Sequence, residues 1–224
     1  MNLSDYLIFI GLDPALGGAT GKGDFLGIGV HVLPKRKPVN APWVPFLTKL
    51  FKLKSKTYKT MWDNLTNTNG ALYPYRNFFS MQVDYTTEKT IGDFLEDKYD
   101  ESRVIKTPFT KGETGSKMRI ANSSLTFLKS GYTFPDHTMI EDPVERENIR
   151  ELKKQIVNEE IVLNADGSVK FRHKGPHNDL LHAWMLSLDE CLKYVVSKQG
   201  STGEYIGSQI NETPEINYGV NTFM

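Results

Sequence analysis

The stretch that decides the fold is Tyr6–Asp24, YLIFIGLDPALGGATGKGD. An apolar run from Tyr6 to Ile10 leads through Gly11 to Asp13, and a loop of small residues follows. The run is too short to cross a membrane and is typical of a buried strand. Asp13 is therefore predicted at the end of a strand, beside a glycine-rich turn, where a carboxylate can serve metal chemistry.

The size and composition of the chain favour one domain. With 224 residues, 39% of them hydrophobic, the chain can bury a core. We expect this domain to span residues 1–198. After Gly200 the sequence becomes polar and loses its periodicity, so residues 199–224 are predicted to form a tail.

Charge and cysteine content exclude several classes of protein. Lys plus Arg equals Asp plus Glu at 27 each, so a nucleic-acid partner would need a local basic patch. The single cysteine, Cys191, excludes an internal disulfide and a zinc cluster of thiolates. The sequence has neither a secretion signal nor an apolar run long enough for a membrane, which predicts an intracellular protein with no membrane partner.

The remaining elements follow from hydrophobic periodicity and predict an α/β fold. Phe25–Leu33 comes soon after the first strand, which predicts an antiparallel hairpin. Further strands are expected at Phe46–Leu53, Phe78–Thr86 and Arg103–Phe109. Helices are expected up to Leu65, over Thr87–Tyr99, over Ser116–Lys129, and from Asp142 or Pro143 through Ile156.

A small hairpin and a long helix complete the predicted domain. Ile161–Leu163 and Val169–Phe171 flank an Asp-Gly pair, which is a hairpin signal. The last helix is predicted to begin near Asn178 and Asp179 and to end near Lys198, with an apolar side that buries Trp184 and Cys191.

Three carboxylates stand at the ends of predicted elements: Asp13, Asp84 and Asp179. Taken singly, each has an ordinary explanation as a turn residue or as a charge at a helix N-terminus. If they converge, their mutual repulsion requires a divalent cation, and Mg²⁺ or Mn²⁺ accepts such oxygen ligands. The hypothesis is metal-assisted phosphodiester hydrolysis, with Asp13 bridging two ions.

Four segments, in this order, resemble the nuclease domain of the large terminase subunit of tailed viruses. They are the first strand with GLDPALGG and GDFLGIGV, then VDYTTEKTIGDFL, TPFTKGETGSKMRIANSSLTFLKSGYTFP and HNDLLHAWMLSL. Together they span most of residues 5–195. The resemblance implies an RNase H-like mixed β-sheet flanked by helices, related to retroviral integrases and Holliday junction resolvases, with the predicted β-hairpin as an auxiliary element before the last long helix.

The resemblance also implies a function and a set of partners. The expected activity is Mg²⁺- or Mn²⁺-dependent endonucleolytic cleavage of double-stranded DNA during viral genome packaging, with Asp13, Asp84 and Asp179 as metal ligands. The implied partners are a packaging ATPase domain or subunit, the portal and the small terminase, in the host cytoplasm. The chain departs from the family pattern at Asn178 and His182, which stand where carboxylates are expected.

For several candidate site residues besides the three acids, two interpretations remain open. His177 and His182 are either capping and packing residues, or an auxiliary ligand and a proton donor. Lys117 and Arg119 form a solvated helix face or contact phosphate. The cluster that best predicts a DNA contact is on the second strand of the hairpin: Lys170, Arg172, His173 and Lys174.

Two other functions remain open. One is a junction resolvase or transposase-like nuclease of the same fold, which would prefer branched DNA. The other is a non-catalytic module that binds DNA or a packaging complex, because Asn178 and His182 replace two expected carboxylates.

Overall fold

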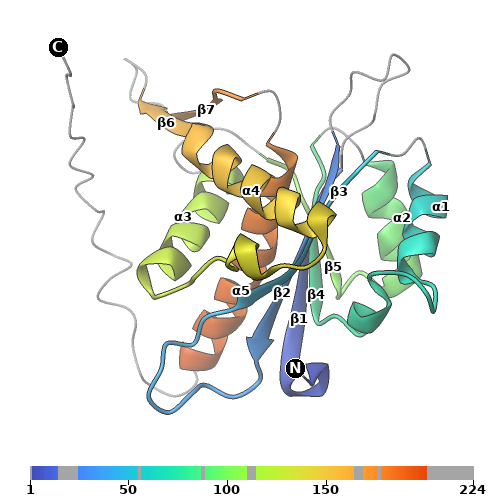
Figure 1. Cartoon of the computed structure of the whole chain (residues 1–224), viewed down its shortest axis with the longest axis horizontal. Coiled ribbons are helices and arrows are strands. Elements are labelled where there is room, and N and C mark those ends of the chain that lie inside the picture. Colours follow the sequence, from blue (N-terminus) through green and yellow to red (C-terminus); the bar gives the residue numbers. More distant parts are fainter. Residues whose placement is uncertain are drawn as a thin grey trace.

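A central five-stranded sheet lies between two layers of helices in the computed structural model of the chain (Figure 1). The structure describes residues 2–14, 25–54, 57–86, 89–109, 115–163, 169–175 and 178–200. The strands of the sheet are β1 (Tyr6–Asp13), β2 (Leu26–Pro34), β3 (Phe46–Leu53), β4 (Ser80–Asp84) and β5 (Val104–Thr107). Their order across the sheet is β3-β2-β1-β4-β5.

Strand directions make the sheet mixed, as predicted. β1 pairs antiparallel with β2, and β2 pairs antiparallel with β3. β1 also pairs in parallel with β4, and β4 pairs in parallel with β5. The predicted hairpin between the first two strands is therefore confirmed, and the parallel half places the ends of β1 and β4 at one edge of the sheet.

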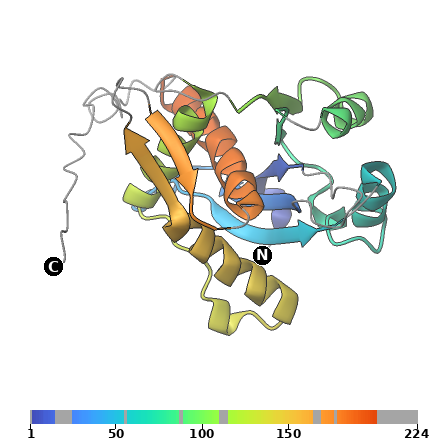
Figure 2. The same ribbon diagram turned by 90° about the horizontal axis from the view of Figure 1, so that it is seen from above.

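Helices cover both faces of the sheet, with α1 and α2 on one side and α3, α4 and α5 on the other (Figure 2). Their bounds are α1 (Tyr58–Thr66), α2 (Thr90–Tyr99), α3 (Ser116–Lys129), α4 (Pro143–Asn158) and α5 (Asp179–Gly200). Short 3-10 turns occupy Leu3–Asp5, Tyr73–Tyr75 and His137–Met139.

The element boundaries follow the sequence prediction closely, although β4 and β5 are shorter than predicted. α4 begins as predicted, because the side chain of Asp142 accepts the backbone N–H groups of Val144 and Glu145. α2 begins at Thr90 rather than Thr87, and its first turn follows Lys89. The predicted tail beyond Gly200 lies outside the described residues.

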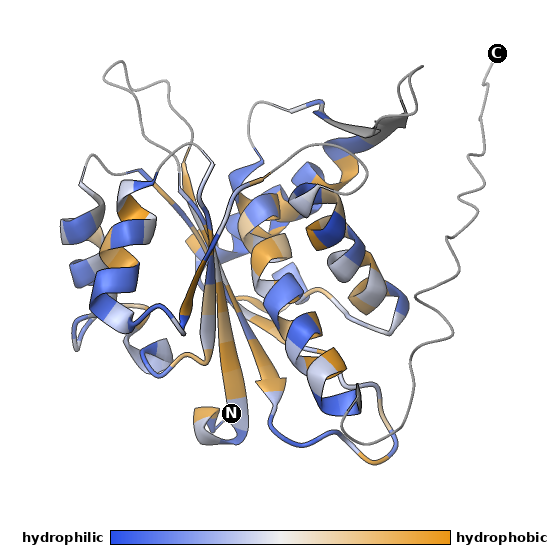
Figure 3. Ribbon diagram, turned by 180° about the vertical axis from the view of Figure 1, so that it is seen from behind, coloured by the Kyte–Doolittle hydropathy of each residue, from blue (hydrophilic) through white to orange (hydrophobic). Residues whose placement is uncertain are grey.

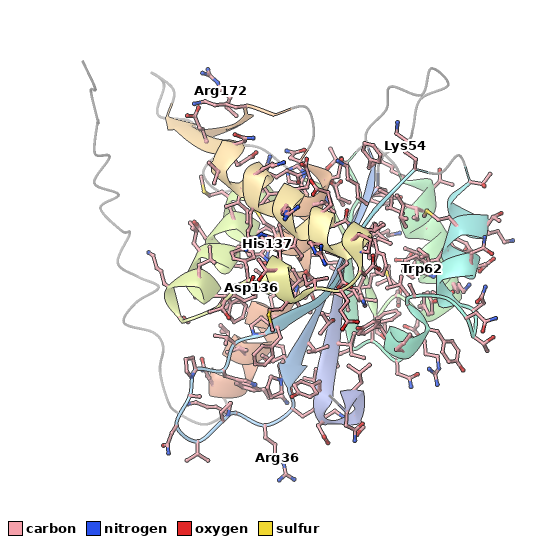
Figure 4. All side chains as sticks on the ribbon, in the orientation of Figure 1. Arg36, Lys54, Trp62, Asp136, His137 and Arg172 are labelled. Carbon is pink, nitrogen blue, oxygen red and sulfur yellow. The ribbon has the colours of Figure 1, made fainter. Side chains whose placement is uncertain are left out.

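Alternation along β1 divides its side chains between two cores. Ile8, Ile10 and Leu12 pack in the core that includes Trp62 of α1. Phe9 belongs to the opposite core, with the apolar side of α5. A strand buried on both faces reads as a continuous apolar run, which is the pattern of the opening stretch. Figure 3 shows apolar strands between helices that turn polar faces outward, and Figure 4 labels Trp62 in the α1–α2 layer.

Glycines let α5 approach the sheet closely. A Cβ atom added at Gly11 of β1 would lie 2.0 Å from the carbonyl oxygen of Ala183. One added at Gly27 of β2 would lie 2.2 Å from the carbonyl oxygen of Asp179. No side chain fits at either position, so these two glycines set the depth of α5 over β1 and β2.

The predicted auxiliary hairpin is present as a separate two-stranded sheet. β6 (Glu159–Leu163) follows α4 directly and pairs antiparallel with β7 (Val169–His173). The Asp-Gly turn that predicted the hairpin lies outside the described residues. In Figure 1 the hairpin projects at the same end of the molecule as the start of α5. Within the described chain, no helix has the length and apolar character needed to cross a membrane.

Candidate functional site

Asp13 and Asp84 end two neighbouring parallel strands. Leu12 of β1 pairs with Val83 of β4, so the two aspartates that follow are adjacent across the ladder. Asp13 follows Gly11 by two residues and so shares its face, which α5 covers. Asp84 shares its face with Ser80, whose hydroxyl donates to α5. The two carboxylates therefore lie at one edge and on one face of the sheet.

One residue of α5, Glu190, holds Ser80 in that orientation. The Ser80 hydroxyl donates to Oε2 of Glu190 at 2.8 Å. Glu190 is a buried residue in the middle of α5. This contact fixes which face of β4 is turned toward α5, and with it the orientation of Asp84 at the strand end.

Asp179 reaches the same edge from above the sheet. It is the first residue of α5, and the absent side chain at Gly27 lets its backbone lie directly over β2. The backbone N–H of Phe25 donates to Oδ2 of Asp179 at 3.2 Å. All three predicted acids are buried, with exposures of 7% for Asp13, 8% for Asp84 and 4% for Asp179. Buried carboxylates in one small region need cations or strong hydrogen bonds nearby.

His182 connects α5 to Asp13. Its Nδ1 lies 3.0 Å from Oδ2 of Asp13, and its Nε2 lies 2.9 Å from Nδ2 of Asn178. An amide nitrogen only donates, so Nε2 accepts and the proton of a neutral ring sits on Nδ1, where it is donated to Asp13. His182 and Asn178, two of the predicted auxiliary residues, therefore orient the carboxylate of Asp13. His177 lies outside the described residues.

The pKa of His182 agrees with a neutral ring. Burial lowers the pKa to about 3, and the positive charge of Lys117 acts in the same direction. The carboxylates of Glu159, Asp84 and Asp179 act against this shift. Charged side chains from α3, β6, β4 and α5 thus lie near enough to His182 to affect its pKa. The candidate site therefore includes residues from all four elements.

Thr86 and Phe109 hold the Asp84 side of the site. Oδ1 of Asp84 accepts both the backbone N–H of Thr86, at 2.9 Å, and its hydroxyl, at 2.5 Å. The Thr86 hydroxyl oxygen in turn accepts the backbone N–H of Phe109 at 2.6 Å. The Phe109 ring meets the ring of His182 edge to face, with centroids 4.9 Å apart. A continuous set of contacts therefore runs from Asp84 to the histidine that orients Asp13.

The sequence prediction missed Glu159. This residue is the first of β6, and its Oε1 lies 3.1 Å from Nζ of Lys117. Only 10% of the Glu159 side chain and 13% of the Lys117 side chain are exposed. The interpretation of Lys117 as part of a solvated face is therefore wrong. Nothing in the local sequence around Glu159 separates it from the other glutamates of this charged segment.

Arg119 is 45% exposed, as the solvated-face interpretation predicted, and its guanidinium also forms a structural ion pair. Its Nη1 lies 2.6 Å from both carboxylate oxygens of Asp189 on α5. Burial alone would raise the pKa of Asp189, but the charge of Lys193 and hydrogen bonds from Arg119 and Ser123 outweigh burial and lower it. These contacts to the buried carboxylate of Asp189 connect α3 to α5.

A basic pair at the end of β3 was also missed, with Lys52 in the strand and Lys54 directly after it. The ammonium groups of Lys52 and Lys54 lie 4.4 Å and 4.7 Å from the centre of the Phe25 ring. The backbone of Phe25 donates to Asp179, so this pair flanks the three acids. Lys52 also lies 3.7 Å from Glu151. The signal was present in the alternation of lysines through the end of β3, which places Lys52 and Lys54 on one face.

The hairpin carries the predicted basic cluster on its second strand. Lys170 belongs to β7, Arg172 is exposed, and Figure 4 shows Arg172 pointing away from the body of the protein. Lys174 follows β7 and is exposed, with its Nζ 2.5 Å from Oε1 of Glu160. Arg172 and Lys174 are therefore accessible to a partner at the end of the molecule where α5 begins.

The donor set suits a hard divalent cation. Among the described residues, no three acid, histidine or cysteine side chains are arranged as they stand to hold one ion. Asp13, Asp84 and Asp179 nevertheless supply carboxylate oxygens from three elements to one edge of the sheet, and Mg²⁺ and Mn²⁺ prefer oxygen ligands.

Comparison with known proteins identifies the architecture. No family model matches the sequence, and no curated protein matches it. The structure is similar to the large terminase nuclease from thermophilic phage G20c, with a TM-score of 0.50, 17% identity and 82% of each chain covered. It is also similar to the large terminase nuclease domain of Thermus phage P74-26, with a TM-score of 0.49, 18% identity, and coverage of 82% of this chain and 79% of that one.

Proposed function

We propose that this chain, which has the α/β RNase H-like fold of a phage large terminase nuclease, is a Mg²⁺- or Mn²⁺-dependent endonuclease that cuts double-stranded DNA during viral genome packaging. The observation that carries the proposal is the convergence of Asp13, Asp84 and Asp179 at one edge and one face of the sheet. Because a fold does not specify an activity, the proposal depends on the residues of the site.

The proposed mechanism assigns a role to each part of the site. Asp13 would bridge two ions, with Asp84 and Asp179 completing the ligand set. The chemistry that such ions supply is activation of a water and neutralisation of charge on the leaving oxygen of a phosphodiester. His182 holds the carboxylate of Asp13 in a fixed orientation, and Thr86 does the same for Asp84. Carboxylates that are already held in one orientation lose less conformational entropy when they bind metal ions.

Basic side chains on both sides of the acids would hold the DNA backbone. Lys52 and Lys54 flank Asp179, and Arg172 and Lys174 extend from the hairpin, with Lys170 on the same strand. Lysine and arginine contacts to phosphate bind DNA without reading its sequence. The proposed partners beyond DNA are a packaging ATPase, the portal and the small terminase, in the cytoplasm of the host.

Nicking of a supercoiled plasmid in Mn²⁺ tests the proposal. The wild-type chain should nick, and Asp13→Asn should not, because the amide removes the proposed bridging charge. Asp136→Asn is a matched control, since Asp136 is exposed, lies on the outer helical layer in Figure 4 and can cap its turn equally well as Asn. Equal nicking by the wild type and Asp13→Asn would contradict the assignment.

Two further measurements separate the proposal from its competitors. Preferential cutting of a four-way junction over a linear duplex of the same sequence would favour a junction resolvase. Millimolar Mn²⁺ should raise the melting temperature by relieving repulsion among the acids. An unchanged melting temperature, together with no nicking, would favour a non-catalytic binding module.

A further inference from the structure

The ion pair between Lys117 and Glu159 lies inside the candidate site. Lys117 is the second residue of α3, and Glu159 is the first residue of β6. Their side chains are nearly buried, and 3.1 Å separates Nζ from Oε1. Both charges act on His182, which contacts Asp13. The pair is therefore close to His182, the residue that contacts Asp13, and not on a remote surface.

Neighbouring contacts fix the lysine end of the pair. The hydroxyl of Ser116 donates to the carbonyl oxygen of Pro108, which ties the start of α3 to the segment after β5. The next residue, Phe109, contacts the ring of His182. Arg119, two residues after Lys117 on α3, is held by Asp189 of α5. Lys117 is thus held beside the acids on a helix that is anchored on both sides.

A fourth carboxylate is unexpected at a site proposed to receive DNA. Asp13, Asp84 and Asp179 already repel a polyanion, and Glu159 adds to that repulsion. Lys117 is the cation that compensates it, and an ammonium group binds a carboxylate oxygen or a phosphate oxygen in the same way. One lysine in a nearly buried position cannot hold both strongly.

We propose that Glu159 competes with a DNA backbone phosphate for Lys117, occupying the place of the phosphate until DNA binds. This inference rests on the proposed function, because it assumes that DNA enters the site. In the absence of DNA, the pair keeps a nearly buried lysine neutralised. When DNA binds, a phosphate oxygen replaces the Glu159 carboxylate at Nζ. The exchange weakens DNA binding relative to a site without Glu159.

Binding of a fluorescein-labelled duplex to the full chain in EDTA, where no metal supports cleavage, measures the competition by anisotropy. Glu159→Gln should bind about fivefold more tightly, which corresponds to the free energy of one modest ion pair. Lys117→Gln should bind more weakly, with a salt slope smaller by about 1. In the Lys117→Gln background, Glu159→Gln should have a much smaller effect, because only the general repulsion of DNA by Glu159 remains.

Two more variants distinguish the direct contact between Glu159 and Lys117 from a general effect of negative charge on DNA binding. Glu159→Asp keeps the charge but withdraws the carboxylate by one methylene group, so its affinity should lie between those of the wild type and Glu159→Gln. Glu147→Gln removes the same charge from an exposed position on α4 and should leave affinity unchanged. Melting temperatures of all variants verify folding.

The outcomes distinguish the inference from the proposed function. A gain in affinity from Glu159→Gln that is equally large with and without Lys117 would mean general repulsion alone and would overturn the competition. Unchanged affinity of Glu159→Gln, in a protein that nicks DNA with Mn²⁺, would overturn the inference alone. No DNA binding by any variant, together with no nicking, would overturn both.

Discussion

Nδ1 of His182 lies 3.0 Å from Oδ2 of Asp13, which joins the last helix to the end of the first strand. The two residues are 169 positions apart in the chain. Asn178 holds the other ring nitrogen, so the ring is oriented from both sides. His182 is therefore a positioning residue for the carboxylate that we propose as the bridge.

Removing this contact should weaken metal binding. In His182→Ala, the Asp13 carboxylate loses its fixed orientation, and the apparent affinity for Mn²⁺ should fall by about tenfold, the usual effect of losing a residue that orients a ligand. A titration of melting temperature against Mn²⁺ measures this without any activity assay. His182→Asn, which can still donate from the Nδ1 position, should retain more affinity. Equal affinities for the wild type and His182→Ala would contradict the positioning role.

The glycines under α5 provide a second prediction. In Gly27→Ala, the new methyl group would meet the carbonyl oxygen of Asp179 at 2.2 Å, so the start of α5 must shift. We expect a loss of about 1–3 kcal/mol in the free energy of unfolding. A loss of Mn²⁺-dependent nicking should accompany it, because Asp179 moves with the helix.

Gly29→Ala is the matched control for this change. Its methyl group would contact the backbone of Ala183 at 3.1 Å, which a shift of a few tenths of an ångström relieves. Urea unfolding of the two variants compares them directly. A Gly27→Ala protein as stable and active as Gly29→Ala would show that α5 tolerates displacement and would contradict the close-packing argument.

The sequence predicted the part of the site that depends on the order of elements along the chain. Asp13 and Asp84 end buried strands, and parallel neighbours bring such ends to one edge of the sheet. Asp179 stands at the start of the last amphipathic helix, where a boundary was visible from the pattern. Local periodicity and element ends were sufficient for these three residues.

The rest of the site depends on packing between elements that are distant in the chain. The Lys117–Glu159 pair forms only because the chain leaves α4 and enters β6 close to the start of α3. Gly11 and Gly27 read as ordinary strand residues, because their role is set by the depth of a helix that is more than 150 positions away. Neither relationship leaves a signal at short range in one sequence.

The basic residues around the site should carry DNA binding. In the double variant of Lys52→Gln and Lys54→Gln, the salt slope of DNA binding should decrease by about 2 if each lysine contacts one phosphate. Replacing Lys170, Arg172 and Lys174 together should likewise weaken binding and flatten its salt dependence. Anisotropy titrations at several salt concentrations measure both.

A control at the far end of the protein tests the location of this surface. Arg36 and Lys37 are exposed, and Figure 4 shows Arg36 at the end opposite the hairpin. Their double replacement by Gln removes the same charge as the change at Lys52 and Lys54, yet should leave the salt slope unchanged. An equal decrease in both double variants would mean that net charge, and not this surface, determines binding.

Acid stability provides the last prediction, through the fully buried His31. Its Nδ1 lies 2.7 Å from the Ser187 hydroxyl, and its Nε2 lies 2.9 Å from the Tyr132 hydroxyl, which also accepts the indole N–H of Trp184. Burial lowers the pKa of His31 to about 3. As the pH falls below about 6.5, the usual pKa of histidine, the unfolded chain binds a proton that the folded protein excludes. The free energy of unfolding therefore declines with falling pH, by about 1.4 kcal/mol per pH unit from this residue.

His31→Asn should remove this contribution while keeping a polar side chain beside Ser187. The variant should be less stable than the wild type at pH 7.5, yet lose about 2 kcal/mol less between pH 6.5 and pH 5. The window stops at pH 5 because carboxylates titrate below it. His182, whose pKa is lowered to about 3 in the same way, remains in both proteins and cancels in the comparison. Urea unfolding at each pH gives the two slopes, and parallel slopes would show that His31 takes up its proton without unfolding.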